Sequence, residues 1–155
     1  MFRRLAVLAA LLALLGPPAA RAAAPTPEAA AYIVVNPATG EVLAERAPDR
    51  ELPMASTTKI MTALVVLERA RLDDVMTVPP EAAAIGGSTG SLRAGERLSV
   101  RHLLVALLVP SGNDAAITLA AGVAGSQAAF VDLMNARAAE LGLTATRFAN
   151  PHGLD

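Results

Sequence analysis

The segment from Ser56 to Ala70 constrains the fold of this 155-residue chain more than any other stretch. Between residues 60 and 67 every position except Thr62 is apolar, and neither proline nor glycine interrupts the run. A helix of this composition is apolar nearly all round, and such a helix is stable only where other elements cover it. The sequence therefore predicts a buried central helix with the rest of the domain built around it.

A β-hairpin is expected before this helix. Residues 31–35 are apolar, residues 36–40 (Asn-Pro-Ala-Thr-Gly) are turn formers, and residues 41–46 follow as a second strand. After the helix, prolines and glycines in residues 79–95 indicate loop and short strand. The stretch Gly86–Gly90 lacks the Gly-Lys-Ser/Thr ending of a phosphate-binding loop, and we interpret it as a turn.

Helices are expected to dominate the remaining sequence, because apolar segments there are preceded by residues that cap helix N-termini. The predicted fold class is α+β, with an N-terminal hairpin, a buried central helix and then mainly helical structure. The expected later helices run from Val100 to Leu108 after Ser99, from Asn113 or Asp114 to about Ala121, and from Ser126 to near Leu141, where Gly142 ends the helix.

The first 24 residues have the pattern of a secretory signal peptide. A short basic start is followed by an apolar run from Leu5 to Leu15, which is too short to span a bilayer, and then by Gly-Pro-Pro. Small residues in the spacing of a cleavage site end at Ala22 and at Ala24. We therefore expect residues 1–24 to be a signal peptide cleaved near one of these alanines. The alternative is a buried or membrane-anchoring N-terminal helix.

Composition excludes several classes of function. The chain has 13 basic and 14 acidic residues and only three phenylalanines and one tyrosine, so it offers no basic stripe or stacking surface for nucleic acid. Without cysteine it has no disulfide, thiolate zinc site or cysteine nucleophile, and two histidines are too few to favour a metal centre. We expect no metal and no cofactor, which leaves serine, threonine or lysine for covalent chemistry.

Lys59 is the single lysine among 13 basic residues and lies three positions after Ser56. Residues at this spacing are neighbours on a helix. Burial and the positive helix N-terminus would both lower the pKa of Lys59, and a neutral amine could take the proton of the Ser56 hydroxyl. Arginine could not do this because it stays protonated in proteins. The alternative is a solvated lysine in the first turn beside an N-cap serine.

A second polar cluster lies at residues 110–114, Pro-Ser-Gly-Asn-Asp, between two apolar segments. Ser111 could relay a proton to a leaving group, and Asn113 could hold a substrate amide while contacting the lysine. The alternative is a helix–helix turn with Asn113 as N-cap.

Other acid–base arrangements are less favoured. A Ser-His-Asp triad would use His102 or His152, but neither has a nearby Gly-x-Ser-x-Gly nucleophile pattern. The paired carboxylates Asp73 and Asp74 lie in a loop, where we expect them to be solvated.

Several of these segments together resemble one enzyme family. Residues 53–62 (Pro-Met-Ala-Ser-Thr-Thr-Lys-Ile-Met-Thr) and 110–116 (Pro-Ser-Gly-Asn-Asp-Ala-Ala) are similar to the first two motifs of the serine D-alanyl-D-alanine carboxypeptidases, the low-molecular-mass penicillin-binding proteins. Residues 36–40, 92–96 and 150–154 also look like that family, so the resemblance runs from about residue 30 to the end. It implies a β-lactamase/transpeptidase-like fold.

The resemblance also implies roles and partners. Ser56 would be the nucleophile acylated by a peptidoglycan stem peptide ending in D-Ala-D-Ala, Lys59 the general base, Ser111 the proton relay and Asn113 a substrate contact. β-Lactams would be inhibitors. The protein would act in the periplasm or at the extracytoplasmic face of the membrane, and a membrane association through a C-terminal segment stays open.

The chain departs from the family pattern in one respect. The third motif, Lys-Thr/Ser-Gly, is absent because Lys59 is the single lysine. In the family that motif binds the substrate carboxylate and supplies an oxyanion donor, whose loss alone costs about 2.7–4 kcal/mol of barrier. We therefore expect residues 25–155 to be a truncated catalytic domain that lacks its C-terminal strands and is inactive as it stands.

Two alternatives to a carboxypeptidase stay open. A class A β-lactamase shares Ser-x-x-Lys but usually has Ser-Asp-Asn where this chain has Ser-Gly-Asn at residues 111–113. The other alternative is an exported domain that binds cell wall without cutting it.

Overall fold

The structure is a computed structural model that describes residues 27–154, and it divides into two units on either side of residue 50. Each unit is considered by itself. The predicted signal peptide, residues 1–24, lies outside the described residues.

The first unit contains the predicted hairpin, which is confirmed. Strands β1 (Tyr32–Val35) and β2 (Val42–Arg46) pair antiparallel, with an irregularity in register at the end of β1. The Asn36 side chain accepts a hydrogen bond from the Ala38 N–H at 3.0 Å, and the Asn36 N–H donates to the Glu41 carbonyl at 2.8 Å, so the turn residues close the hairpin as their types predict.

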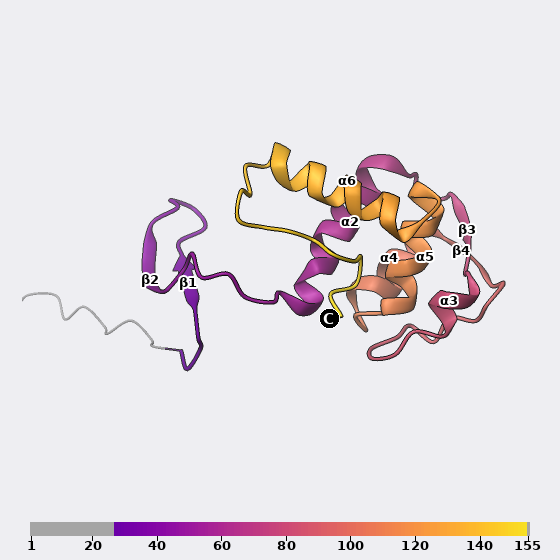
Figure 1. The fold of residues 1–155 in the computed structure, drawn as a ribbon, viewed down its shortest axis with the longest axis horizontal. Helices are drawn as coiled ribbons and strands as arrows, with labels where there is room; N and C mark the ends of the chain where they lie inside the picture. Colours follow the sequence, from indigo (N-terminus) through magenta and orange to yellow (C-terminus); the bar gives the residue numbers. More distant parts are fainter. Residues whose placement is uncertain (1–26, 155) are drawn as a thin grey trace, which may run out of the picture. The chain divides into compact units, whose positions relative to one another are not determined.

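The second unit is mainly helical, as Figure 1 shows. Its two short strands, β3 and β4, pair antiparallel and form a separate two-stranded sheet. The sequence predicts short strand here but neither this pairing nor helix α3, since elements of three or four residues carry little periodicity. The elements are η1 (Ala55–Thr57), α2 (Thr58–Arg69), β3 (Val75–Thr77), α3 (Pro80–Ala83), β4 (Arg97–Ser99), α4 (Val100–Leu108), α5 (Asn113–Ala124) and α6 (Gln127–Glu140).

Two of the three expected helix starts are capped as predicted. The Ser99 hydroxyl accepts the His102 N–H at 3.3 Å at the start of α4, and the Ser126 hydroxyl accepts the Ala129 N–H at 3.1 Å at the start of α6. Helix α5 differs, because its N-cap is Gly112, which has no side chain to accept a hydrogen bond. Asn113 is therefore the first helical residue and not the cap, and its side chain is free for other contacts.

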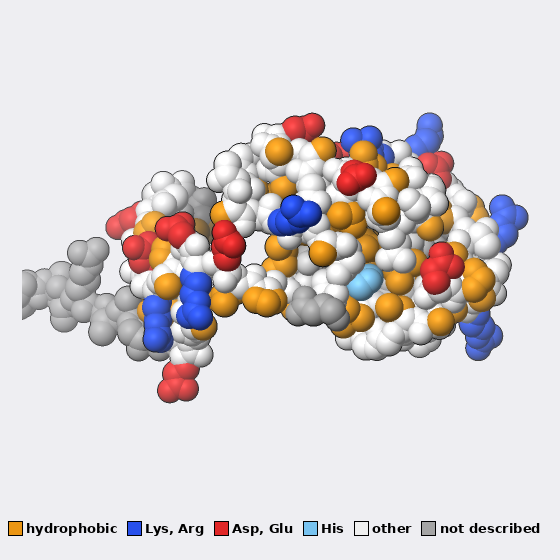
Figure 2. Space-filling view, in the orientation of Figure 1, with side chains coloured by type: hydrophobic (Ala, Val, Ile, Leu, Met, Phe, Trp, Pro, Cys, Tyr) orange, Lys and Arg blue, Asp and Glu red, His pale blue; other side chains and the backbone are white. Residues whose placement is uncertain are grey.

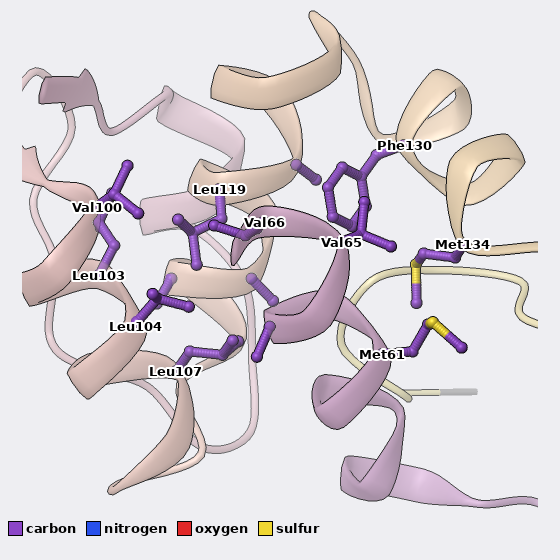
Figure 3. Packing of buried hydrophobic residues seen from close by; sticks show 14 of the residues in the cluster. Met61, Val65, Val66, Val100, Leu103, Leu104, Leu107, Leu119, Phe130 and Met134 are labelled. Atoms are coloured by element: carbon purple, nitrogen blue, oxygen red, sulfur yellow. The ribbon is translucent and has the colours of Figure 1, made fainter. Parts of the chain in front are cut away.

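Helix α2 lies at the centre of the second unit and contacts α4, α5 and α6. Figure 3 shows Val66 of α2 directed toward the side chains of α4 and α5, and Val65 and Met61 directed toward Phe130 and Met134 of α6. Val65 and Val66 are 1% and 0% exposed. The core therefore forms around the helix that the sequence places at the centre.

One face of α2 is the exception to its predicted burial. Ile60 and Leu67 are 68% and 56% exposed, and they share a face of the helix because they are seven residues apart. No element of the described second unit packs over that face. Apolar side chains are also visible over the surface of this unit in Figure 2.

None of the described helices alone is long and apolar enough to cross a membrane, and α5 and α6, which reach that length only together, meet at a bend of 86°.

Two neighbouring leucines of α4 test this assignment of core and surface. Leu107 is fully buried, whereas Leu108 is 54% exposed. We expect Leu107→Ala to lower the free energy of unfolding by about 2–5 kcal/mol through lost burial and a residual cavity, and Leu108→Ala by less than about 1 kcal/mol. Chemical denaturation of both variants measures the difference, and equal effects would contradict the packing described here.

Candidate active site

Ser56 and Lys59 lie at the junction of η1 and α2. The turn before α2 contains Ala55 with a φ of 46°, and it presents Ser56 at the surface. Lys59 is in the first turn of α2, and its Nζ donates a hydrogen bond to the Ser56 Oγ at 3.2 Å. The spacing of three residues therefore brings the hydroxyl and the amine together.

Lys59 is only 2% exposed, so the alternative of a solvated lysine beside a capping serine is wrong. Burial lowers the pKa of Lys59, because the charged ammonium loses hydration that the neutral amine needs less. The Nζ has a second partner, the backbone carbonyl of His152, to which it donates at 2.7 Å. The amine is thus held between a nucleophile candidate and a fixed carbonyl.

The carbonyl belongs to a compact loop at residues 150–154, one of the segments that resemble the family. The Asn150 Oδ1 accepts the N–H groups of His152 and Gly153 at 3.1 and 2.6 Å, and the Asn150 Nδ2 donates to the Leu154 carbonyl at 2.6 Å. One asparagine side chain therefore folds the loop. The Asn-Pro-His-Gly-Leu sequence indicates a turn closed by its asparagine, but nothing in it shows that the loop contacts Lys59.

The two histidines do not form a triad with Ser56. The ring of His152 is buried, and its Nδ1 accepts the Leu154 N–H at 3.1 Å, so that nitrogen carries no proton. Burial, and then the charge of Lys59, lower the pKa of His152 and keep the ring neutral. His102 instead pairs with Ser99 at 2.8 Å at the start of α4. In residues 27–154 neither ring is hydrogen-bonded to Ser56.

Ser111 faces the same pocket as Ser56 and Lys59. The pocket has a volume of about 280 Å³. Ser111 reaches it from the turn between α4 and α5 with a φ of 61°, a conformation that few non-glycine residues adopt. The structure therefore brings three of the four predicted site residues to one place. The pocket is lined by Ser56, Thr57, Lys59, Ile60, Leu107, Leu108 and Ser111.

Asn113 is placed differently from expectation. Its Nδ2 donates to the Gly86 carbonyl at 2.8 Å and its N–H donates to the Ser88 carbonyl at 2.8 Å. Within the described part of the chain no hydrogen bond joins Asn113 to Lys59, because its amide group is engaged by the glycine-rich loop. That loop bends at residues 87–88, which agrees with its interpretation as a turn.

Asp114 is a site residue that sequence reasoning missed. It is 1% exposed, and its carboxylate accepts the N–H groups of Gly90 and Leu92 at 2.8 and 2.9 Å. Together with Asn113 it ties the loop of residues 86–92 to the start of α5. A buried carboxylate needs such donors, but the sequence does not show which backbone groups supply them.

Gly153 tests the close approach of the 150–154 loop to the turn before α2. It has a φ of 82°, and a Cβ at this position would overlap the Ala55 carbonyl oxygen. Gly142 has a similar φ of 73° but open space around it. We expect Gly142→Ala to cost about 1–2 kcal/mol for the left-handed backbone alone.

Gly153→Ala should cost distinctly more and should also slow any reaction of Ser56, because the backbone must move at the site. Thermal unfolding of the two variants measures the first effect. Equal losses of stability would show that the loop does not lie against Ala55 as described.

Known proteins resemble this chain in sequence and in fold. The family model described as D-alanyl-D-alanine carboxypeptidase matches residues 19–155. The chain is 42% identical to D-alanyl-D-alanine carboxypeptidase DacC of Escherichia coli (strain K12), with 100% of this chain and 42% of the relative covered. It is 38% identical to DacF of Bacillus subtilis (strain 168), over 82% of this chain and 34% of the relative.

Solved structures show the same relationship. The crystal structure of the D-alanyl-D-alanine carboxypeptidase DacD from Francisella tularensis matches with a TM-score of 0.84 and 37% identity, over 93% of this chain and 36% of that one. The carboxypeptidase structure from Mycobacterium tuberculosis matches with a TM-score of 0.81 and 38% identity, over 89% of this chain and 52% of that one. The chain spans less than half the length of the two curated relatives, DacC and DacF. Its match to the family model over most of its length shows that it belongs to the D-alanyl-D-alanine carboxypeptidase family.

Proposed function

We propose that this chain carries the nucleophile and the general base of a serine-type D-Ala-D-Ala carboxypeptidase. The observation that carries the proposal is the hydrogen bond between the Lys59 Nζ and the Ser56 Oγ, made by an amine that is almost fully buried. A buried lysine with a lowered pKa can be neutral near physiological pH, and a neutral amine can activate a serine hydroxyl.

The proposed substrate is a peptidoglycan stem peptide ending in D-Ala-D-Ala. Lys59 takes the proton of Ser56 as its Oγ attacks the carbonyl of the penultimate D-alanine. The bond to the terminal D-alanine breaks, and that amine leaves with a proton relayed through Ser111. Water then hydrolyses the ester on Ser56, which returns the hydroxyl. Neither the acylation nor the hydrolysis needs a cofactor.

Asn113 is assigned to substrate contact by the family resemblance. Its Nδ2 is held by the Gly86 carbonyl, which fixes the orientation of the side chain amide. The Lys-Thr/Ser-Gly motif, to which the family assigns carboxylate binding and one oxyanion donor, does not occur in these 155 residues. Turnover is therefore proposed for a protein in which such groups complete the site, whereas activation of Ser56 is proposed for this chain.

The same chemistry suggests partners and location. A β-lactam carries a strained amide that can acylate Ser56 in place of the peptide, and we propose β-lactams as inhibitors. Peptidoglycan lies outside the cytoplasmic membrane, and the leader-like sequence of residues 1–24 supports export. We therefore propose an extracytoplasmic location.

A class A β-lactamase and a binding module without catalysis are the competing assignments. The relatives found support neither. Labelling by a penicillin distinguishes an enzyme from a binding module, and the lifetime of the adduct distinguishes the enzymes, because a β-lactamase releases it rapidly.

Labelling by a fluorescent penicillin tests the nucleophile. We expect mass spectrometry to find the adduct on the peptide that contains Ser56, because only this serine is bonded to an amine among the described hydrogen bonds. Ser56→Ala should abolish the adduct. Ser88→Ala is the matched control, since Ser88 is exposed and its hydroxyl has no described partner. An adduct that survives in Ser56→Ala, or no adduct in the unmodified chain, would contradict the proposal.

The pH dependence of labelling tests the base. The rate should rise with pH as Lys59 loses its proton, with a midpoint below the ordinary pKa of lysine because burial lowers that pKa. Lys59→Arg should slow labelling by roughly 100-fold or more, since arginine keeps its proton. A rate independent of pH, or normal labelling of Lys59→Arg, would show that another group activates the serine.

A further inference from the structure

We propose that Thr62 is a positioning residue for the general base, which acts by holding the 150–154 loop so that the His152 carbonyl meets the Lys59 amine. The inference rests on the proposed function and names a residue that determines the geometry of the same site.

Thr62 and Lys59 donate hydrogen bonds to neighbouring carbonyls of one loop. Thr62 is one turn after Lys59 on the same face of α2 and is fully buried. Its hydroxyl donates to the Pro151 carbonyl at 2.7 Å, and the Lys59 Nζ donates to the next carbonyl, that of His152, at 2.7 Å. Two consecutive turns of the central helix therefore bind two consecutive peptide groups.

The His152 carbonyl matters because of the electronic structure of a neutral amine. Such an amine has two N–H donors and one lone pair, and it accepts a proton only along the lone pair. For Lys59 to act as a base, its hydrogen bond with Ser56 must reverse once the amine is neutral: the lone pair then faces the Ser56 Oγ and accepts from its hydroxyl, so the N–H groups must be directed elsewhere. The His152 carbonyl accepts one of these N–H groups and thereby orients the lone pair. A shift of this carbonyl would misdirect the base.

Thr62 joins the loop that contains this carbonyl to α2. Asn150 fixes the loop from within, because its Oδ1 accepts the His152 and Gly153 N–H groups. Asn135 binds the backbone of Phe148 through two hydrogen bonds of 2.9 Å, which anchors the segment before the loop. Gly153 lies against Ala55 after it. None of these contacts ties the Pro151 carbonyl to α2, which the Thr62 hydroxyl does. Without the Thr62 hydroxyl the buried Pro151 carbonyl would lack its partner, and the loop would move to find one.

Three variants separate positioning from stability. Thr62→Val keeps the shape of the side chain and removes the donor, whereas Thr62→Ser keeps the hydroxyl and should restore the site. Thr118→Val is the matched control, because Thr118 is also fully buried and its hydroxyl donates to a backbone carbonyl, that of Asp114, at 2.8 Å. Both valine variants lose a buried hydroxyl, but the Asp114 carbonyl lies in a helix and keeps a backbone partner, so Thr118→Val controls for the change of side chain alone.

The first measurement is the rate of Ser56 labelling by fluorescent penicillin across pH. Because misplacement of a reacting group by about 1 Å can cost about 100-fold, we expect Thr62→Val to slow labelling by roughly 10- to 100-fold, while Thr62→Ser and Thr118→Val stay within about threefold of the unmodified chain. If Thr62→Val and Thr118→Val label equally fast, the inference is overturned.

The second measurement does not depend on activity. Lys59 is the single lysine of the chain, so isotope-labelled lysine gives one side-chain NMR signal whose titration reports its pKa. In Thr62→Val the loosened loop should admit water, and the midpoint should move toward that of a solvated lysine. An unchanged midpoint would overturn the inference. Failure of the unmodified chain to label at Ser56 would instead overturn the proposed function and leave this titration to decide the role of Thr62.

Discussion

The site depends on one buried amine, that of Lys59, placed between the Ser56 hydroxyl and the His152 carbonyl. Burying a lysine is unfavourable while it is charged, and the penalty falls on the protonated form. The same penalty lowers the pKa of the amine and favours its neutral, basic form. The hydrophobic packing of α2 therefore supports the site directly, because it removes water that would stabilise the protonated amine.

The other elements determine which groups lie next to the Lys59 amine. Helices α4, α5 and α6 pack around α2, and the 150–154 loop contacts its first turns through the Lys59 and Thr62 side chains. The turn between α4 and α5 presents Ser111 to the same pocket. Asp114 holds the glycine-rich loop beside that turn through two backbone N–H groups. The contacts that pack the other elements against α2 therefore also place the groups of the candidate site.

Sequence reasoning predicted the features that depend on local chemistry. The hairpin, the serine caps of α4 and α6 and the approach of Ser56 to Lys59 follow from turn formers, capping hydroxyls and helical spacing. It missed features created by contacts between distant residues. Three kinds of hydrogen bond join residues far apart in sequence: those that the Asp114 carboxylate accepts, the one from the Thr62 hydroxyl to the Pro151 carbonyl, and the one from the Asn113 side-chain amide to the Gly86 carbonyl. The exposed face of α2 was also missed, because composition shows that a helix is apolar but not which neighbours cover it.

The most direct test of this account is the pKa of Lys59 in the folded, unmodified chain. The chain is prepared with isotope-labelled lysine, so that its single lysine gives one side-chain NMR signal, and that signal is followed through a pH titration. The account predicts a midpoint below that of a solvated lysine, with the signal of a denatured sample as the reference. A midpoint at or above the reference would contradict the claim that burial prepares Lys59 to act as the base for Ser56.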